Sequence, residues 1–168
     1  MTMRCFIVMG VSGCGKSSVG SGVAAQIGAT FTDGDDLHPK ANIQKMAAGI
    51  PLQDADRYPW LDKVADTLRT AEGPCVIACS ALKRKYRDQI RNRVGEPVLF
   101  LYLHGSRDVL QKRMSARRGH FMPVSQLDSQ LNDLEPPDNS ETHITVDIDQ
   151  PIQAVIQDAV EKIKGVRE

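Results

Sequence analysis

The sequence lacks the features of membrane-spanning, secreted and disulfide-rich proteins. Its longest unbroken apolar run, 98–103, has six residues, whereas a membrane-spanning helix needs roughly 20. The first residues lead straight into a strand-like run, without the apolar core and cleavage site of a signal peptide. The four cysteines include no Cys-x-x-Cys pair, which argues against a zinc site or a disulfide framework and favours buried free thiols. We therefore expect a cytoplasmic protein that does not contact a membrane.

The sequence also has no net charge. Its 21 basic residues balance 21 acidic ones, which gives no support to binding of nucleic acid or of a membrane surface. The distribution is uneven, however. Residues 83–118 contain eleven Lys or Arg and three acids, whereas 119–160 contain eight acids and no Lys or Arg. The basic segment is either a solvated helical face or a surface that attracts an anionic ligand, and composition leaves both interpretations open.

Length and apolar patterning indicate one globular domain with buried strands. The chain has 168 residues, of which 41% are hydrophobic and 25% charged, as is typical of a single domain. Three continuous apolar runs, 5–9, 75–79 and 98–103, suit strands that are buried on both faces of a parallel sheet. Segments 29–33 and 143–148 are weaker strand candidates.

Helical periodicities fall between these runs. Apolar spacing predicts a helix over 152–163, with Gly165 just past its end. A second stripe predicts a helix over 60–68, and a narrower one predicts a helix over 19–27 that ends at Gly28. Strands that alternate with helices predict a three-layer α/β domain, with about five parallel strands and helices on both faces.

The strongest motif is a phosphate-binding loop. Gly10-Val11-Ser12-Gly13-Cys14-Gly15-Lys16-Ser17 matches Gly-x4-Gly-Lys-Ser/Thr, directly after the first apolar run and before the first helix. Its glycines let backbone N–H groups converge on phosphate at the positive end of a helix. Lys16 is expected to reach the β- and γ-phosphates, Ser17 to bind Mg²⁺, and Ser18 to complete the nucleotide site. The alternative, an accidental match in a glycine-rich turn, is expected in fewer than about one chain in a hundred of this length.

Other motifs decide which kind of nucleotide-binding protein this is. A GTPase switch would carry Asn-Lys-x-Asp and Asp-x-x-Gly, and neither string occurs. A motor ATPase usually has an acid at the end of an apolar strand, yet the third and fourth predicted strands lead into Ser80 and His104. A small-molecule kinase remains the favoured class.

Acidic and basic groups suit phosphoryl transfer. In Asp33-Gly34-Asp35, one carboxylate could hold Mg²⁺ through water while the other accepts the proton of an attacking hydroxyl. The alternative is a loop of solvated acids. Arg113 and Arg117 share a helical face by their i, i+4 spacing, and Arg118 follows. These arginines could close over the transferring phosphate, or simply form a basic helical face.

Together these residues resemble the gluconokinase family of P-loop carbohydrate kinases, which is related to shikimate and adenylate kinases. The resemblance covers nearly the whole chain and is most specific in Asp33-Gly34-Asp35-x-Leu37-His38-Pro39 and Asp56-Arg57-x-Pro59-Trp60-Leu61. It continues in Cys79-Ser80-Ala81-Leu82-Lys83 with Tyr86-Arg87, in Arg117 with Gly119-His120-Phe121, and in Val146-Asp147-Ile148-Asp149-Gln150-Pro151. The sequence departs from the family at Cys14, where a small residue such as Ser is common, and at Asp36, where an apolar residue can stand. Cys14 could make the activity sensitive to oxidation.

The resemblance implies phosphorylation of D-gluconate at its 6-hydroxyl, with ATP and Mg²⁺, usually by a homodimer. It implies an acceptor-binding segment over about 35–72 and a lid over about 113–135. A polyhydroxylated carboxylate needs a cation for its carboxylate and polar partners for its hydroxyls. The candidates for that acceptor site are Asp35, His38, Arg57, Lys83, Arg87, Arg118 and His120, and those for the nucleotide beyond the loop are Arg113, Arg117, Gln150 and Pro151.

Some alternatives stay open. Asp35 is the favoured general base and Asp33 the favoured metal-side acid, but the spacing allows the reverse. Lys16, Asp35 and Arg117 are the expected catalytic residues. His38 is either a substrate ligand or a histidine satisfied within the fold, and Trp60 is expected in the core. The rival functions are a kinase for another small hydroxy acid, such as shikimate, and a nucleotide-binding protein without turnover.

Overall fold

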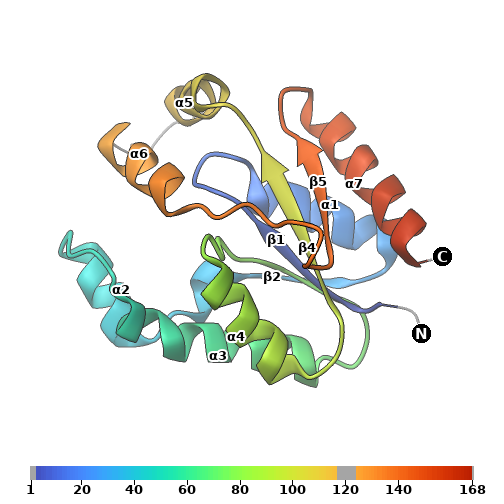
Figure 1. Ribbon diagram of the computed structural model, residues 1–168, viewed down its shortest axis with the longest axis horizontal. Coiled ribbons are helices and arrows are strands. Elements are labelled where there is room, and N and C mark those ends of the chain that lie inside the picture. The colour runs from blue at the N-terminus through green and yellow to red at the C-terminus, as the bar shows by residue number, and fades with distance from the viewer. Residues whose placement is uncertain (1–2, 117–123, 168) are drawn as a thin grey trace.

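The computed structural model describes residues 3–116 and 124–167 as an alternation of strands and helices (Figure 1). The elements in chain order are β1 (Cys5–Met9), α1 (Lys16–Ile27), β2 (Thr30–Asp33), the 3₁₀ helix η1 (Gly34–Leu37), α2 (Lys40–Ala47), α3 (Asp54–Thr70), β3 (Cys75–Ala78), α4 (Arg84–Val94), β4 (Val98–His104), α5 (Arg107–Ala116), α6 (Val124–Asp133), β5 (His143–Asp147) and α7 (Ile152–Arg167). Each of the five predicted strands is present, including the two weaker candidates.

The strands form one parallel sheet in the order β2-β3-β1-β4-β5. β1 lies at the centre, and its Ile7 is level with Ile77 of β3 on one side and Phe100 of β4 on the other. The chain therefore leaves β1 at the point where connections on the two sides diverge. In open α/β sheets, ligands bind beyond the carboxyl ends of the strands at such a point.

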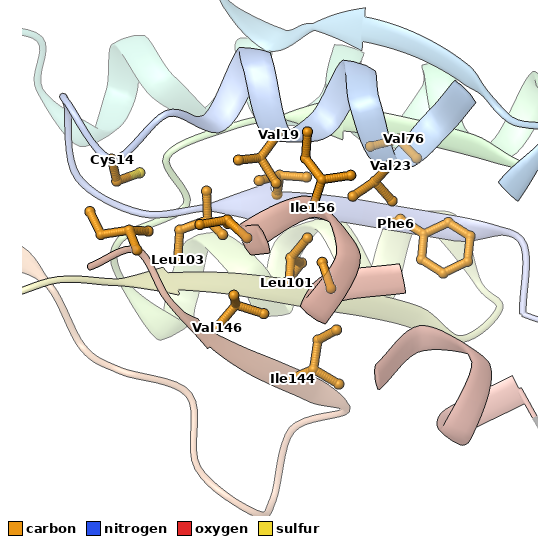
Figure 2. Close-up of a cluster of buried hydrophobic side chains, with 14 of the residues drawn as sticks. Phe6, Cys14, Val19, Val23, Val76, Leu101, Leu103, Ile144, Val146 and Ile156 are labelled. Atoms are coloured by element: carbon orange, nitrogen blue, oxygen red, sulfur yellow. The ribbon is translucent and has the colours of Figure 1, made fainter. Parts of the chain in front are cut away.

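Side chains alternate between two cores, one on each face of the sheet. Phe6 and Val8 of β1 pack with residues of α1 and α7, whereas Ile7 and its neighbours Cys5 and Met9 pack with residues of α3 and α4. Figure 2 shows the first of these cores, where α1 and α7 contribute Val23 and Ile156. Burial on both faces explains the continuous apolar runs, and the predicted three-layer architecture is confirmed.

Two helix ends test the boundary predictions. α1 ends where expected, because Gly28 adopts the left-handed conformation (φ 72°) that closes many helices. The predicted end before Gly165 is wrong, since α7 continues to Arg167. One glycine costs only about 1 kcal/mol in a helix, and α7 is anchored by buried residues as far along as Ile163.

Two further expectations concern the cysteines and the membrane. All four cysteines are free and buried, as predicted. Within the described ranges, no helix combines the length and apolar character that crossing a bilayer requires.

Candidate active site

The glycine-rich loop occupies the expected place between β1 and α1. Gly10, Gly13 and Gly15 have φ values of 148°, 86° and 92°, which side chains rarely tolerate. α1 begins at Lys16, so the loop amides lie at the positive end of the helix dipole. Gly13 also packs against α5, where an added Cβ would lie 2.4 Å from Met114 Cγ. The local backbone therefore has the form that binds phosphate.

Lys16 and Ser17, the last two residues of the motif, each donate a side-chain hydrogen bond at this loop. The Lys16 ammonium donates to the carbonyls of Gly10 (3.0 Å) and Val11 (3.1 Å), which places its charge over the loop. The Ser17 hydroxyl donates to Asp33 Oδ2 at 2.8 Å. The structure thus brings together the two residues that the sequence predicts for Mg²⁺.

The Asp33-Gly34-Asp35 turn is held tightly against the end of β3. Asp33 Oδ1 accepts from the Asp35 amide at 3.0 Å, which caps η1 and fixes the carboxylate of Asp33 between this amide and the Ser17 hydroxyl. A Cβ on Gly34 would lie 2.3 Å from the carbonyl oxygen of Ala78. Asp35 itself is exposed. The turn therefore presents the Asp35 carboxylate to solvent beside a carboxylate that is already engaged.

Trp60 contacts this turn directly, and His38 packs on Trp60. Trp60 is in the core, as expected, and its indole N–H donates to the Gly34 carbonyl at 2.7 Å. His38 stacks on Trp60 with 4.1 Å between ring centroids and 16° between planes. Burial lowers the pKa of His38, so the ring is neutral at pH 7.

The hydrogen bonds of His38 also define its tautomer. Asn42 Nδ2 donates to the Asp56 carbonyl at 2.8 Å and lies 3.2 Å from His38 Nδ1. An amide nitrogen can only donate, so Nδ1 accepts and the neutral ring carries its proton on Nε2. His38 is therefore satisfied within the fold at Nδ1 and offers a donor at Nε2.

Two of the predicted substrate cations meet around Tyr86. Arg57 Cζ lies 5.6 Å and Lys83 Nζ 5.9 Å from the centroid of the Tyr86 ring. The Tyr86 hydroxyl and Lys85 both bind Asp54, and the hydrogen bonds from Lys85 and Tyr86 hold the pKa of Asp54 at about 2. Arg57 Nη1 lies 3.8 Å from Asp54 Oδ1. α3, α4 and the residue that caps the amino end of α4 thus assemble a basic cluster from positions far apart in sequence: Arg57, Lys85 and Lys83.

Arg87 occupies a different kind of place. It is fully buried, and its side chain pairs with Glu141 through Nε (2.7 Å) and Nη2 (2.9 Å). Its remaining N–H groups donate to the carbonyls of Ala81, Leu82 and Glu135. All five donors of the guanidinium are engaged within the fold, which leaves none for a substrate. The expected substrate contact at Arg87 is thus corrected to a contact inside the protein.

The remaining predicted residues divide between the described and undescribed parts of the chain. Arg113 donates to the carbonyls of Ile148 and Gln150 (3.0 Å for the latter), so α5 holds the loop between β5 and α7 that includes Pro151. This contact brings Arg113, Gln150 and Pro151 together. Arg117, Arg118 and His120 lie outside the described residues.

One contact was missed by the sequence analysis. Gln130 of α6 accepts from the Ser12 amide at 2.7 Å and donates to the Ser12 hydroxyl at 3.0 Å, across 118 positions of sequence. Gln130 is not part of any motif that could have indicated this contact. α6 therefore touches the phosphate-binding loop directly.

The donor set is compatible with a nucleotide-bound Mg²⁺. Within the part of the chain that the structure describes, three or more His, Cys, Asp or Glu residues never gather into a metal site. Mg²⁺ is commonly held by one or two protein oxygens together with phosphate oxygens and water. The paired oxygens of Ser17 and Asp33 fit that pattern.

The environment of Cys14 does not favour the sensitivity to oxidation that the sequence suggested. Its exposed fraction is 1%, and burial raises the pKa of its thiol. Figure 2 shows it at the end of the core, near Leu103. Because the thiolate is the reactive form, both properties argue against oxidation at this position.

Comparison with known proteins agrees with this geometry. A family model described as an AAA domain matches residues 6–137. The thermoresistant gluconokinase of Escherichia coli is 47% identical over 164 residues, covering 95% of this chain and 93% of the relative. The gluconokinase of Gluconobacter oxydans is 44% identical over 160 residues, covering 94% and 89%.

Solved structures give the same result. A gluconokinase from Sinorhizobium meliloti superposes with a TM-score of 0.90 at 45% identity, covering 97% of this chain and 93% of the other. Shikimate kinase from Aquifex aeolicus, at 13% identity and a TM-score of 0.64 over 96% of both chains, shares the fold alone. The chain has the phosphate-binding loop and the acidic turn, and it is 44–47% identical to gluconokinases over nearly its full length. The chain therefore belongs to the gluconokinase family of P-loop kinases.

Proposed function

We propose that this protein transfers the γ-phosphoryl group of ATP to the 6-hydroxyl of D-gluconate. The observation that carries the proposal is the link from Ser17 through Asp33 to Asp35. Asp33 accepts from the Ser17 hydroxyl and from the Asp35 amide, which supports a role for the exposed Asp35 near the predicted position of the terminal phosphates. The near full-length gluconokinase relatives support D-gluconate as the acceptor.

On the nucleotide side, the loop from Gly10 to Ser18 would hold the phosphates. Backbone amides and the Lys16 ammonium supply the positive potential. Ser17 and Asp33 would hold Mg²⁺, which supplies charge neutralisation on the phosphate oxygens when bound. Lys16 exchanges its present carbonyl acceptors for phosphate oxygens, which are stronger partners for an ammonium.

On the acceptor side, Asp35 would take up the proton of the 6-hydroxyl. The hydroxyl oxygen then bonds to the γ-phosphorus, and the bond from that phosphorus to the bridging oxygen breaks as ADP leaves. Arg57 and Lys83 would bind the carboxylate of the sugar acid, since both lie beside the Tyr86 ring, where the third cation, Lys85, is paired with Asp54. The Nε2–H of His38 would donate to one of the hydroxyls.

The lid and the assembly remain proposals. Arg113, Arg117, Arg118 and His120 would act from the segment 113–135 to neutralise charge and exclude water. The segment 35–72 would bind the acceptor. A homodimer, a cytoplasmic location and the absence of nucleic-acid and membrane partners also remain predictions.

Phosphate transfer across a panel of acids tests the proposal. We expect ADP release stimulated by D-gluconate and not by shikimate, with 6-phosphogluconate as the product. Lys16→Ala and Asp35→Asn should each lower kcat by roughly 100-fold or more without unfolding the protein. Asp36→Asn is the matched control, because Asp36 is the adjacent exposed acid, and it should retain wild-type turnover. ATP binding without acceptor-stimulated turnover would instead identify a nucleotide-binding protein.

A further inference from the structure

The buried pair of Arg87 and Glu141 is the most enclosed charged contact that the described residues make. Their side chains are 0% and 1% exposed, and they form a two-pronged ion pair. Glu141 also accepts from Arg91 at 2.8 Å. Burial opposes ionisation of Glu141, but the hydrogen bonds from the two arginines outweigh it and hold the pKa of this carboxyl below its usual value. Such a pair is costly to desolvate, and an apolar core would serve stability as well.

One side of the pair holds the loop between β3 and α4, residues 79–83. Arg87 Nη1 donates to the carbonyls of Ala81 (2.8 Å) and Leu82 (3.2 Å). Ala81 has φ 43°, a left-handed conformation that costs energy for a residue with a Cβ. Lys83, a proposed ligand of the gluconate carboxylate, comes two residues later. The Arg87 guanidinium therefore holds the strained backbone at Ala81, which sets the position of Lys83.

The other side of the pair holds the segment that leaves α6. Arg87 Nη2 donates to the Glu135 carbonyl at 2.7 Å, the Glu135 amide donates to the Leu82 carbonyl at 2.8 Å, and the Arg84 amide donates to Glu135 Oε1 at 2.9 Å. Figure 1 shows this segment passing the amino end of α4. The α6 helix that precedes it carries Gln130. The loop of Lys83 and the end of α6 are therefore joined at one buried point.

We propose that Arg87 and Glu141 are positioning residues for the acceptor. They hold the loop 79–83 so that Lys83 meets the gluconate carboxylate, and they tie that loop to α6. This inference rests on the proposed function. It assigns the pair mainly to acceptor affinity, because Lys83 belongs to the acceptor side, whereas the loop 79–83 meets the phosphate-binding loop through backbone, with the Gly10 amide donating to the Ser80 carbonyl at 3.3 Å.

The test replaces the pair with apolar residues of similar size. Arg87→Met/Glu141→Leu removes both charges together, so neither is left buried alone. We expect the KM for D-gluconate to rise about tenfold or more, while the KM for ATP changes by less than about twofold. Amide hydrogen exchange should accelerate at Arg84 and Glu135. If the double variant fails to fold, Arg87→Lys is the second variant. It keeps a positive charge beside Glu141 but cannot form the two-pronged contact, so we expect a smaller rise in the KM for D-gluconate.

A matched control lies at the amino-terminal end of the central strand β1. Arg4 also binds several carbonyls, including those of Leu68 and Ala71, together with Glu96. Arg4→Met/Glu96→Leu should leave both KM values unchanged even if it lowers the melting temperature.

The outcomes separate the two proposals. An unchanged KM for gluconate in the folded Arg87 variants, an equal rise in both KM values, or unaltered exchange at Arg84 and Glu135 would overturn the positioning role. A wild-type protein that does not phosphorylate gluconate would contradict the proposed function, and the exchange rates would still decide whether the pair holds the loop.

Discussion

Replacing Gly34 by alanine perturbs the acidic turn at one defined point. The added Cβ would lie 2.3 Å from the backbone oxygen of Ala78, whereas Cβ atoms essentially never approach a neighbour closer than 3.0 Å. Because β3 lies inside the sheet, the turn must move away by about 0.7 Å, the difference between these two distances. Displacing a catalytic group by about 1 Å can cost about 100-fold in rate. We expect kcat to fall roughly 30- to 100-fold and the free energy of unfolding to fall by about 1–3 kcal/mol.

A coupled assay of ADP release, with D-gluconate and ATP varied separately, measures this effect. The KM for ATP should change less than kcat, because the phosphate-binding loop does not contain Gly34 and only Asp33 of the displaced turn contacts Ser17. Gly73→Ala is the matched control, since a Cβ there meets nothing within 4 Å, and its stability should stay within about 0.5 kcal/mol of wild type. A Gly34→Ala enzyme with wild-type kcat would refute the placement of Asp35 by this turn.

Trp60, Cys14 and His38 each give a further prediction. Trp60→Phe removes the donor to the Gly34 carbonyl and should lower the free energy of unfolding by about 1–3 kcal/mol in urea denaturation followed by circular dichroism; an unchanged midpoint would contradict the contact. Peroxide should leave both wild type and Cys14→Ser fully active, because the buried thiol has a raised pKa, and selective protection by the serine would disprove this. The folded-state pKa of His38 lies below its unfolded value, so its stabilisation is present above about pH 6.5 and lost as pH falls through the folded pKa. The unfolding free energy should therefore fall on acidification below about pH 6.5, and His38→Gln should flatten that slope.

The sheet could be predicted because both of its faces are buried. Strands such as Cys5–Met9 and Val98–His104 are apolar at nearly every position, so the sequence itself carries the pattern. The phosphate-binding loop is equally local, since its positive φ values require glycine. α2 could not be found in this way, because its buried residue is Asn42 and its Ile43 and Met46 are exposed.

The detailed arrangement of the candidate site was predictable mainly where its residues are close in sequence, whereas Arg57 and Lys83 were named as acceptor ligands without the arrangement that brings them together at Tyr86. Asp33 and Asp35 form one short turn, and their arrangement follows from the Asp-Gly-Asp string. Arg87 was predicted as a ligand of the acceptor, whereas the structure pairs it with Glu141, which is 54 positions away. Gln130 reaches Ser12 across 118 positions. Burial and partners of this kind depend on how distant elements pack, which periodicity and local motifs do not specify.

We propose that Asp35, in the turn whose Asp33 binds the Ser17 hydroxyl, activates the 6-hydroxyl of D-gluconate for phosphoryl transfer from ATP. The most direct test is the single-turnover rate of 6-phosphogluconate formation by wild type, Asp35→Asn and Asp36→Asn, with product identified by mass spectrometry. We expect rapid formation by wild type and Asp36→Asn, and a rate lower by roughly 100-fold or more in a folded Asp35→Asn protein that still binds ATP. Wild-type rates in Asp35→Asn, or no phosphorylated gluconate from the wild-type protein, would contradict it.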